Sequence, residues 1–175
     1  MKHVIAVLVE NKFGVLSRIS GLFSARGFNI DSLAVGETDD PAVSRMTIVV
    51  EGDERTLEQV KKQLNKLIDV IKVQDFTGKD FMDRELVLIK VSASAKTRKE
   101  IVSLAESVGA EVANVSPKCI TIEETGDQGK IKALFELLKP FGIREVVRTG
   151  RIAIGTEQEL VLDSTKKEKN GKAEE

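Results

Sequence analysis

The chain has 175 residues, of which 41% are hydrophobic and 31% are charged, a composition that suits one globular domain or two small ones. Its 27 basic and 28 acidic side chains leave a net charge of -1, so there is no basic excess for binding nucleic acid phosphates. The longest unbroken apolar run, Val4–Val9, is far too short to span a bilayer, and we recognise no signal-peptide pattern, so we expect a cytoplasmic protein that binds neither membrane nor nucleic acid.

In the first half of the chain, hydrophobic periodicity alternates between strand-like and helix-like segments. Gly27 ends the first helical pattern, and the turn cluster ETDDP at residues 37–41 separates two strand-like runs. We predict, in chain order, a strand over 3–10, a helix carrying Val15, Leu16, Ile19, Leu22 and Phe23, strands over 28–36 and 43–51, a helix carrying Leu57, Val60, Leu64, Leu67 and Ile68, and a strand over 70–76. The order is β-α-β-β-α-β, which is that of a ferredoxin-like unit.

A polar stretch, TGKDFMDRE, follows from Thr77, and the same order of elements then starts again. In this second half we predict a strand over 86–92, a helix carrying Ile101, Leu104, Ala105 and Val108, strands over 111–115 and 118–123, a helix carrying Ile131, Leu134, Phe135 and Leu138, and a strand over 143–149. The segment RIAIGTEQEL that follows fits either an extra strand or a loop.

The predicted fold class is therefore α+β, with two tandem ferredoxin-like βαββαβ units. The expected boundaries are residues 1–77 for the first unit, 78–85 for a linker, 86–160 for the second unit and 161–175 for a charged tail. From Asp163 onward the tail has no apolar side chain larger than that of Ala173, so it should be solvated or flexible.

The first predicted strand is apolar on both faces. Val4, Ala6 and Leu8 face one way, and the residues between them face the other. Helices cover only one face of the sheet in a ferredoxin-like unit, so the second face must be covered by something else. We expect association into a homodimer, with burial against the second unit of the same chain as the alternative.

Few residues could carry out catalysis. Cys119 is the only cysteine and His3 the only histidine, which leaves no disulfide, no histidine pair for a metal and no plausible catalytic triad. The pair Asp39-Asp40 is best explained as a solvated turn, and the sequence has no glycine-rich phosphate loop. We expect no catalytic residues, no cofactor and no metal site in this chain.

The loop from Asn11 to Gly14 is the best candidate for a binding site. It lies between the first strand and the first helix, where free backbone N–H groups and the helix dipole favour an anion. Gly14 would let a ligand carboxylate approach the backbone, and Asn11 and Asn29 offer amide groups suited to an amino acid. Val15, Leu16 and Ile30 could line an apolar wall. Asparagine and glycine are also ordinary turn formers, and these residues taken alone favour a simple turn over a binding site.

The sequence also resembles a known family. LVENKFGVLSRISGLFSARGFNIDSL resembles the ligand-binding half of an ACT domain, a βαββαβ module that binds amino acids. TDDPAVSRMTIVVEGDERTLEQVKKQLNKLIDVIKV and RELVLIKVSA resemble the regulatory small subunit of acetohydroxyacid synthase, also called acetolactate synthase. The resemblance covers about residues 1–160, which is nearly the whole chain.

This resemblance implies a regulatory role in branched-chain amino acid biosynthesis. The family's catalytic subunit is a separate chain that carries thiamine diphosphate, Mg²⁺ and FAD. The small subunit activates it and confers feedback inhibition by valine, in some cases also by leucine or isoleucine. The ACT domains pair side by side as a homodimer, with valine at the interface.

The resemblance also implies which residues bind the effector. One chain would supply Asn11, Gly14, Val15 and Leu16, and its partner would supply Asn29 and Ile30. Two further residues in the same turn, Ser17 and Arg18, would support the site.

Three other classes have the same order of elements or a similar size. A stand-alone ACT-type regulator acting on another protein is the main alternative. An RNA-recognition module would need aromatic side chains on the strand SRMTIVV, which has none. A small metal chaperone would need a C-x-x-C motif, which is missing.

Overall fold

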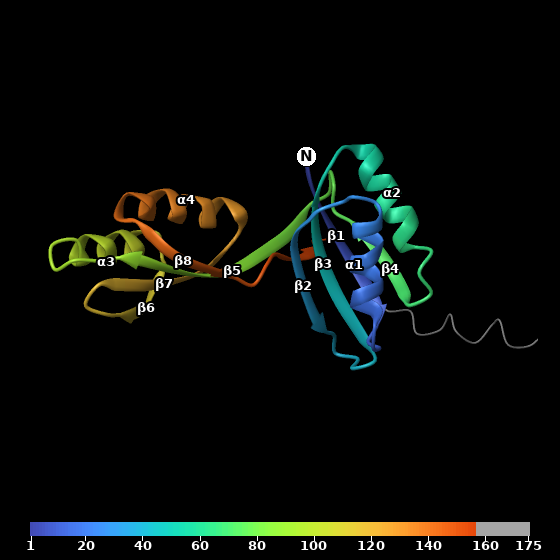
Figure 1. The fold of residues 1–175 in the computed structure, drawn as a ribbon, viewed down its shortest axis with the longest axis horizontal. Coiled ribbons are helices and arrows are strands. Elements are labelled where there is room, and N and C mark those ends of the chain that lie inside the picture. The colour runs from blue at the N-terminus through green and yellow to red at the C-terminus, as the bar shows by residue number, and fades with distance from the viewer. Residues whose placement is uncertain (157–175) are drawn as a thin grey trace, which may run out of the picture.

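The N-terminal unit is a four-stranded antiparallel sheet with two helices on one face (Figure 1). The computed structural model describes residues 1–156. The elements of this unit are β1 (Lys2–Glu10), α1 (Val15–Ala25), β2 (Ile30–Glu37), β3 (Val43–Glu51), α2 (Glu54–Leu64) and β4 (Val70–Asp75). The strand order is β2-β3-β1-β4, so β1 and β3 are central and β2 lies at one edge.

The core of this unit lies between the sheet and its two helices. From β1, Ile5, Val7 and Val9 point toward the helices and are at most 1% exposed. Side chains at helical spacing meet them, among them Ile19 of α1 and Val60 of α2. The periodicity of two in the strand and of about 3.6 in the helices therefore places both apolar stripes in one core.

The C-terminal unit repeats this arrangement with a sheet in the order β6-β7-β5-β8. Its elements are β5 (Phe81–Ser92), α3 (Arg98–Ser107), β6 (Glu111–Val115), β7 (Cys119–Gly126), α4 (Gln128–Leu138), a 3₁₀ turn η1 (Lys139–Phe141) and β8 (Ile143–Arg148). Its core combines alternate residues of β5, which are Val87, Ile89 and Val91, with the buried faces of α3 and α4. The α+β fold with two ferredoxin-like units is thus confirmed.

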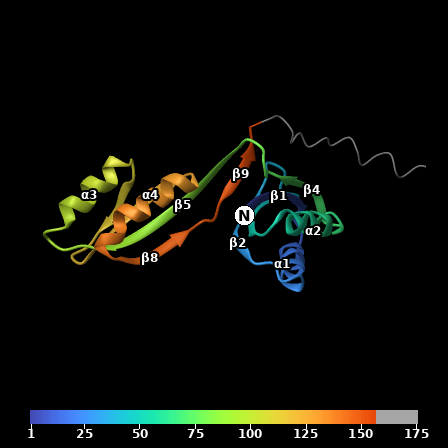
Figure 2. The same cartoon turned by 90° about the horizontal axis from the view of Figure 1, so that it is seen from above.

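A two-stranded ribbon joins the units. Strand β9 (Ile152–Gly155) pairs antiparallel with the first half of β5, from Phe81 to Arg84, and the second half of β5 enters the C-terminal sheet. Figure 2 shows β5 and β9 running side by side from one unit to the other. The strand interpretation of RIAIGTEQEL is therefore correct for its first part, up to Gly155, and residues from 157 on lie outside the described range.

This ribbon covers much of the second face of the N-terminal sheet. Ala153 of β9 packs with Val4 and Ala6 of β1, all at most 6% exposed, and Phe81 stacks on Phe76 with ring centroids 5.1 Å apart. The two-faced strand is therefore covered within its own chain. The alternative predicted from the sequence, burial within the same chain, therefore applies to this face of β1. Covering this face does not require a second copy.

Two element boundaries differ from expectation for physical reasons. Strand β5 begins at Phe81, inside the expected linker, because pairing with β9 extends it. Helix α2 ends at Leu64 rather than near Ile68, and Ile68 is 93% exposed. The backbone N–H of Asn65 donates to the Lys61 carbonyl at 3.1 Å, and the side-chain amide of Asn65 donates to the same carbonyl at 3.0 Å, so this residue caps the last turn of the helix.

No helix among residues 1–156 is both long and apolar enough to cross a membrane. Within the same range, no three His, Cys, Asp or Glu side chains gather closely enough to hold a metal ion.

Candidate functional site

Asn11 is held by the hairpin that joins β2 to β3. Its side-chain nitrogen donates to Glu37 Oε1 at 3.0 Å and to the Pro41 carbonyl at 2.9 Å, and its backbone N–H donates to the Ala42 carbonyl at 2.7 Å. A primary amide has two N–H donors, and both are used here. The side-chain carbonyl oxygen of Asn11 is therefore the part of the amide left for a ligand, and it is an acceptor suited to an ammonium group.

Gly14 directly precedes α1 in a left-handed conformation with φ of 84°. It provides no side-chain cap for the helix, and a Cβ placed on it would meet no atom within 4 Å. The Val15 N–H donates to the Lys12 carbonyl at 3.4 Å, and the next amides of the first turn, at Leu16 and Ser17, lie at the positive end of the helix dipole, where a carboxylate is favoured. Glycine is needed here for its backbone angle, and the open space in front of it is where a ligand could lie.

The other residues expected on this side of the site have different environments. Val15 is 4% exposed and belongs to the core, so it fixes the start of α1. Leu16 is 45% exposed and Ser17 is also exposed. Arg18 forms an ion pair with Asp69 at 3.0 Å, which ties α1 to the loop before β4. Leu16 is thus an apolar side chain that this side of the site can offer to a ligand, and Phe13, which is fully exposed in the same loop, is another.

Asn29 and Ile30 lie at the start of β2. Asn29 is exposed and donates to the carboxylate of Asp31 at 2.9 Å, while Ile30 is partly buried against the core. Asp31 also pairs with the ammonium group of Lys2 at 3.1 Å. Hydrogen bonds from Lys2 and then from Asn29 hold the pKa of the Asp31 carboxyl below its usual value, so the carboxylate that orients Asn29 stays charged.

The two halves of the expected site are far apart within one chain. Ile30 lies level with His3 near the beginning of β1, because both are opposite Val50 of β3. Glu37, which holds Asn11, lies at the other end of β2. The eight residues of β2 are separated by seven steps of about 3.3 Å, which puts the two ends of the strand roughly 23 Å apart. A single chain therefore does not bring Asn11 and Asn29 together.

Sequence analysis missed the residues that orient the two asparagines. Glu37 was assigned to a turn cluster, and Asp31 was treated as an ordinary strand residue, yet each accepts a hydrogen bond from one asparagine amide. Asp31 follows Asn29 by two residues, a local spacing at which an amide and a carboxylate often meet. Glu37 is 26 residues from Asn11, and no local pattern indicated that pair.

The side chains of the single histidine and the single cysteine lie close to polar groups of neighbouring loops and lie outside the candidate binding loop. His3 is 1% exposed, and its two ring nitrogens lie within hydrogen-bonding distance of Thr77 Oγ1 at 3.0 Å and of the Gly52 carbonyl at 3.1 Å. Cys119 is the first residue of β7, and its sulfur lies 3.0 Å from Ser116 Oγ. Neither residue lies in the loop that carries Asn11 and Gly14.

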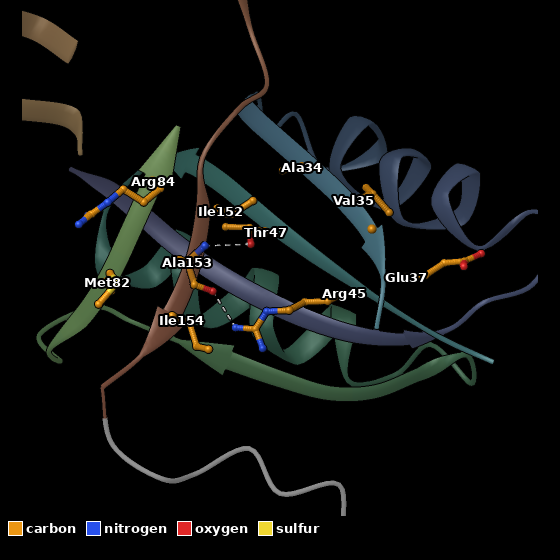
Figure 3. A pocket seen from close by; sticks show the side chains of 11 residues that line it. Ala34, Val35, Glu37, Arg45, Thr47, Met82, Arg84, Ile152, Ala153 and Ile154 are labelled. Carbon is orange, nitrogen blue, oxygen red and sulfur yellow. Dashed lines mark hydrogen bonds between the residues drawn. The ribbon is translucent and has the colours of Figure 1, made fainter. Parts of the chain in front are cut away.

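A groove of about 410 Å³ opens on the second face of the N-terminal sheet, beside β9. Its floor includes small residues of β2, among them Ala34 and Gly36, and its far wall is the ribbon. Figure 3 shows the guanidinium of Arg45 pointing at the backbone of Ala153 within this groove. Glu37 is also among the lining residues, but its carboxylate points away from the groove in Figure 3 and accepts the hydrogen bond from Asn11.

The two units match two family models. Residues 5–72 match the model described as the AHAS small subunit-like ACT domain, and residues 84–157 match the model described as the small subunit of acetolactate synthase. AHAS here abbreviates acetohydroxyacid synthase. Together the two matches span most of the chain.

Similar proteins carry the same description. The chain is 49% identical over 160 residues to the acetolactate synthase small subunit of Aquifex aeolicus, covering 91% of this chain and 83% of that protein. It is 51% identical over 152 residues to the acetolactate synthase small subunit of Mycobacterium leprae, covering 87% and 90%. The crystal structure of the acetolactate synthase small subunit from Thermotoga maritima superposes with a TM-score of 0.78 at 38% identity, covering 89% of this chain and 97% of that one.

Proposed function

Because this chain belongs to the family of acetolactate synthase small subunits, we propose that it activates a separate catalytic subunit of that enzyme and makes it sensitive to feedback inhibition by valine. Leucine or isoleucine would act in the same way if the pocket admits a larger side chain. The chain itself would carry no catalytic residues, and thiamine diphosphate, Mg²⁺ and FAD would be bound by the catalytic subunit. Both subunits would work in the cytoplasm.

The observation that carries this proposal is that the two asparagines lie beside opposite ends of β2, Asn11 next to Glu37 and Asn29 next to Ile30. Strand β2 is an edge strand, so it can pair with another strand. A two-fold axis that pairs two β2 strands antiparallel would place the Glu37 end of one chain beside the Ile30 end of its partner. Asn11 and Gly14 of one chain would then face Asn29 and Ile30 of the other. The pairing would create two equivalent sites, each with residues from both chains.

The chemistry of these groups fits the backbone of an amino acid. The first-turn amides of α1 beside Gly14 would receive the carboxylate. The carbonyl oxygen of Asn11, whose amide hydrogens are already bonded, would accept from the ammonium group. Leu16 of one chain and Ile30 of the partner would contact the aliphatic side chain. A short branched aliphatic side chain would pack against these two residues and would need no polar partner.

Regulation would follow from a difference in affinity between two states. Valine at the interface would favour the paired arrangement of ACT domains in which both halves of the site are in contact. The catalytic subunit would respond if its activated state requires a different arrangement. By linkage, binding of the catalytic subunit would then lower the affinity for valine by the same factor.

Reconstitution tests this function. The chain is added in increasing amounts to the acetolactate synthase catalytic subunit of the same organism, and acetolactate formation is measured with and without valine. We expect activity to rise to a plateau and valine to reduce it. If activity stays constant, this chain is not an activating subunit of that enzyme. If it rises but no branched-chain amino acid reduces it, the feedback part of the proposal is wrong and the activation part stands.

A further inference from the structure

The N-terminal sheet touches the C-terminal half of the chain at a small polar contact beside the ribbon. On one side of the contact is β2, and on the other is the short connection between β8 and β9, which carries Gly150 and Arg151. The backbone N–H of Arg151 donates to Ser32 Oγ at 3.0 Å. Figures 1 and 2 both show this connection passing beside β2. We call the contact of Ser32 with Gly150 and Arg151 the joint.

Gly150 fits the joint because it has no side chain. Its φ is 83°, which lies in the left-handed region that favours glycine. A Cβ placed on it would lie 2.9 Å from Ser32 Oγ and 3.1 Å from the Leu33 carbonyl oxygen, closer than such atoms normally approach. The backbone at Gly150 therefore lies directly against β2, so the position of the connection depends on the position of this part of the strand.

Arg151 links the joint to the C-terminal unit. Its Nε and Nη2 lie 2.8 and 2.6 Å from Asp83 Oδ2, and the two side chains are only 13% and 15% exposed. Its Nη1 donates to Gln128 Oε1 at 3.3 Å, and Gln128 is the first residue of α4. A planar guanidinium bonded at several nitrogens is held in one orientation. A displacement of the Arg151 backbone would therefore be passed on to the start of α4.

The rest of the boundary between the units leaves room for movement. A polar cavity of about 300 Å³ lies beside the joint. Its lining includes Lys2 and Asp31 of the N-terminal unit and Glu85 and Arg148 of the C-terminal unit. Two domains that meet through polar groups, and not through a large apolar interface, can change their relative orientation. The joint lies where that orientation can be set.

The joint is also next to one half of the proposed effector site. Asn29 donates to Asp31, and Asp31 directly precedes Ser32. The pairing of β2 with β3 shifts register between Ile30 and Ser32, which leaves Asp31 as an extra residue in the ladder, as in a β-bulge. A bulge bends its strand and redirects the side chains beside it. A ligand that fixes Asn29 would therefore fix Asp31 with it and favour one position of Ser32.

We infer that Ser32 is a positioning residue that couples the effector site to the C-terminal unit through its contact with Gly150 and Arg151. An effector bound at Asn29 would favour the arrangement in which the Arg151 N–H is bonded to Ser32, and this arrangement would set the orientation of the C-terminal unit. The inference rests on the proposed function, because it takes Asn29 as part of the effector site. It adds the route by which the effector acts on the other half of the chain.

Hydrogen exchange tests this coupling without the catalytic subunit. Exchange of the Arg151 amide is followed by NMR in the full chain, with and without valine, and calorimetry establishes the concentration at which valine saturates the protein. We expect bound valine to slow exchange of this amide about tenfold, a typical size for coupling between two sites. The amides of α3, at the far side of the C-terminal unit in Figure 1, should not change. An Arg151 amide that exchanges equally fast with valine bound would overturn the inference.

Ser32→Ala tests the same contact through regulation of activity. The variant removes the acceptor for the Arg151 N–H and adds no bulk, so the fold should persist. The matched control is Ser107→Ala, because the Ser107 hydroxyl donates to the Leu104 carbonyl within α3 at 2.7 Å and is remote from the joint. Each chain is titrated into the catalytic subunit until activation is maximal. Valine is then added at the concentration that saturates that chain in calorimetry, so a change in affinity does not affect the comparison.

We expect Ser32→Ala to activate like the wild type, whereas saturating valine should lose most of its inhibitory effect. The control should be inhibited as strongly as the wild type. Equal inhibition of Ser32→Ala and the wild type would overturn the inference. A Ser32→Ala chain that no longer binds valine would place Ser32 in the binding site itself, which also overturns it. If the wild type binds no valine, the proposed effector site fails and the inference fails with it, and calorimetry on the wild type alone identifies that outcome.

Discussion

The guanidinium of Arg45 donates to the carbonyl oxygen of Ala153 at 2.7 Å, although the two residues are 108 positions apart in the sequence. Arg45 lies on β3 in the N-terminal unit, and Ala153 lies on the strand that returns from the C-terminal unit. A charged donor gives a stronger hydrogen bond than a neutral one. The backbone N–H of Ala153 also reaches Thr47 Oγ1, but at 3.4 Å this second bond is long and weak. The hydrogen bond from Arg45 is therefore the main polar contact between β3 and β9.

Replacing Arg45 with methionine should loosen the ribbon. The variant keeps an apolar stem but leaves the buried Ala153 carbonyl without its donor, which should cost about 1.5–3 kcal/mol of unfolding free energy. Urea unfolding measures this loss, and hydrogen exchange at the Ala153 amide should become faster. Arg45→Lys retains a charged donor and should recover part of the stability. Unchanged stability and exchange in Arg45→Met would show that apolar packing alone holds the ribbon.

The charge and the shape of an added side chain can be separated at Gly14. Asp and Asn have nearly the same size, and both tolerate the left-handed conformation that this position requires, with φ of 84°. Gly14→Asp places a carboxylate where the ligand carboxylate should lie, so calorimetry should detect no valine binding. Gly14→Asn should bind valine more tightly than Gly14→Asp, since it adds no negative charge. Full valine binding by Gly14→Asp would move the effector site away from this loop.

The fold could be predicted because its signals are local. The apolar, β-branched run in Val43–Glu51 and the helical spacing in α4 are visible in single segments, and such segments give the repeated order of elements. The start of β5 was not visible, because Phe81 becomes a strand residue by pairing with Gly155, which is 74 positions later. The polar appearance of Asp83 suggested a linker, whereas its partner Arg151 lies across the ribbon.

The candidate site was predictable in its backbone and less so in its side-chain contacts. Gly14 between a strand and a helix identifies a turn with free amides, and its φ agrees with that expectation. Both amide hydrogens of Asn11 are donated to acceptors in a separate hairpin, Glu37 and the Pro41 carbonyl. Spacing along the chain gives no sign of these two hydrogen bonds. It is therefore the fold that leaves only the side-chain oxygen of Asn11 for the proposed ligand.

The cap of α2 should make stability depend on pH. The backbone N–H of Thr56 donates to Asp53 Oδ1 at 2.7 Å, and this bond holds the pKa of the Asp53 carboxyl below its usual value. A lowered pKa in the folded state gives stability that is present above the unfolded value, near 3.8, and is lost as the pH falls through the folded value. Asp53→Ala should lower the melting temperature at pH 7 by roughly 2–4 °C.

The comparison across pH gives the check. The difference between wild type and Asp53→Ala should shrink as the pH falls below 3.8. Asp53→Asn keeps an oxygen acceptor for Thr56 without a titrating group, so its melting temperature should stay near that of the wild type at pH 7. A difference between wild type and Asp53→Ala that is the same at pH 7 and at acid pH would show that the carboxylate charge does not contribute.

Mixing two inactive variants would establish whether the effector site lies between chains. Asn11→Ala and Asn29→Ala should each abolish valine binding, because every site in the dimer then lacks one asparagine. In a mixed dimer, one site combines the intact Asn11 of one chain with the intact Asn29 of the other, and the second site lacks both. Random exchange makes half of the dimers mixed, so the mixture should recover about a quarter of the wild-type binding capacity. Calorimetry after unfolding and refolding the two chains together measures this recovery. If each site lay within a single chain, no combination of these variants would restore binding, and the arrangement across β2 would be wrong.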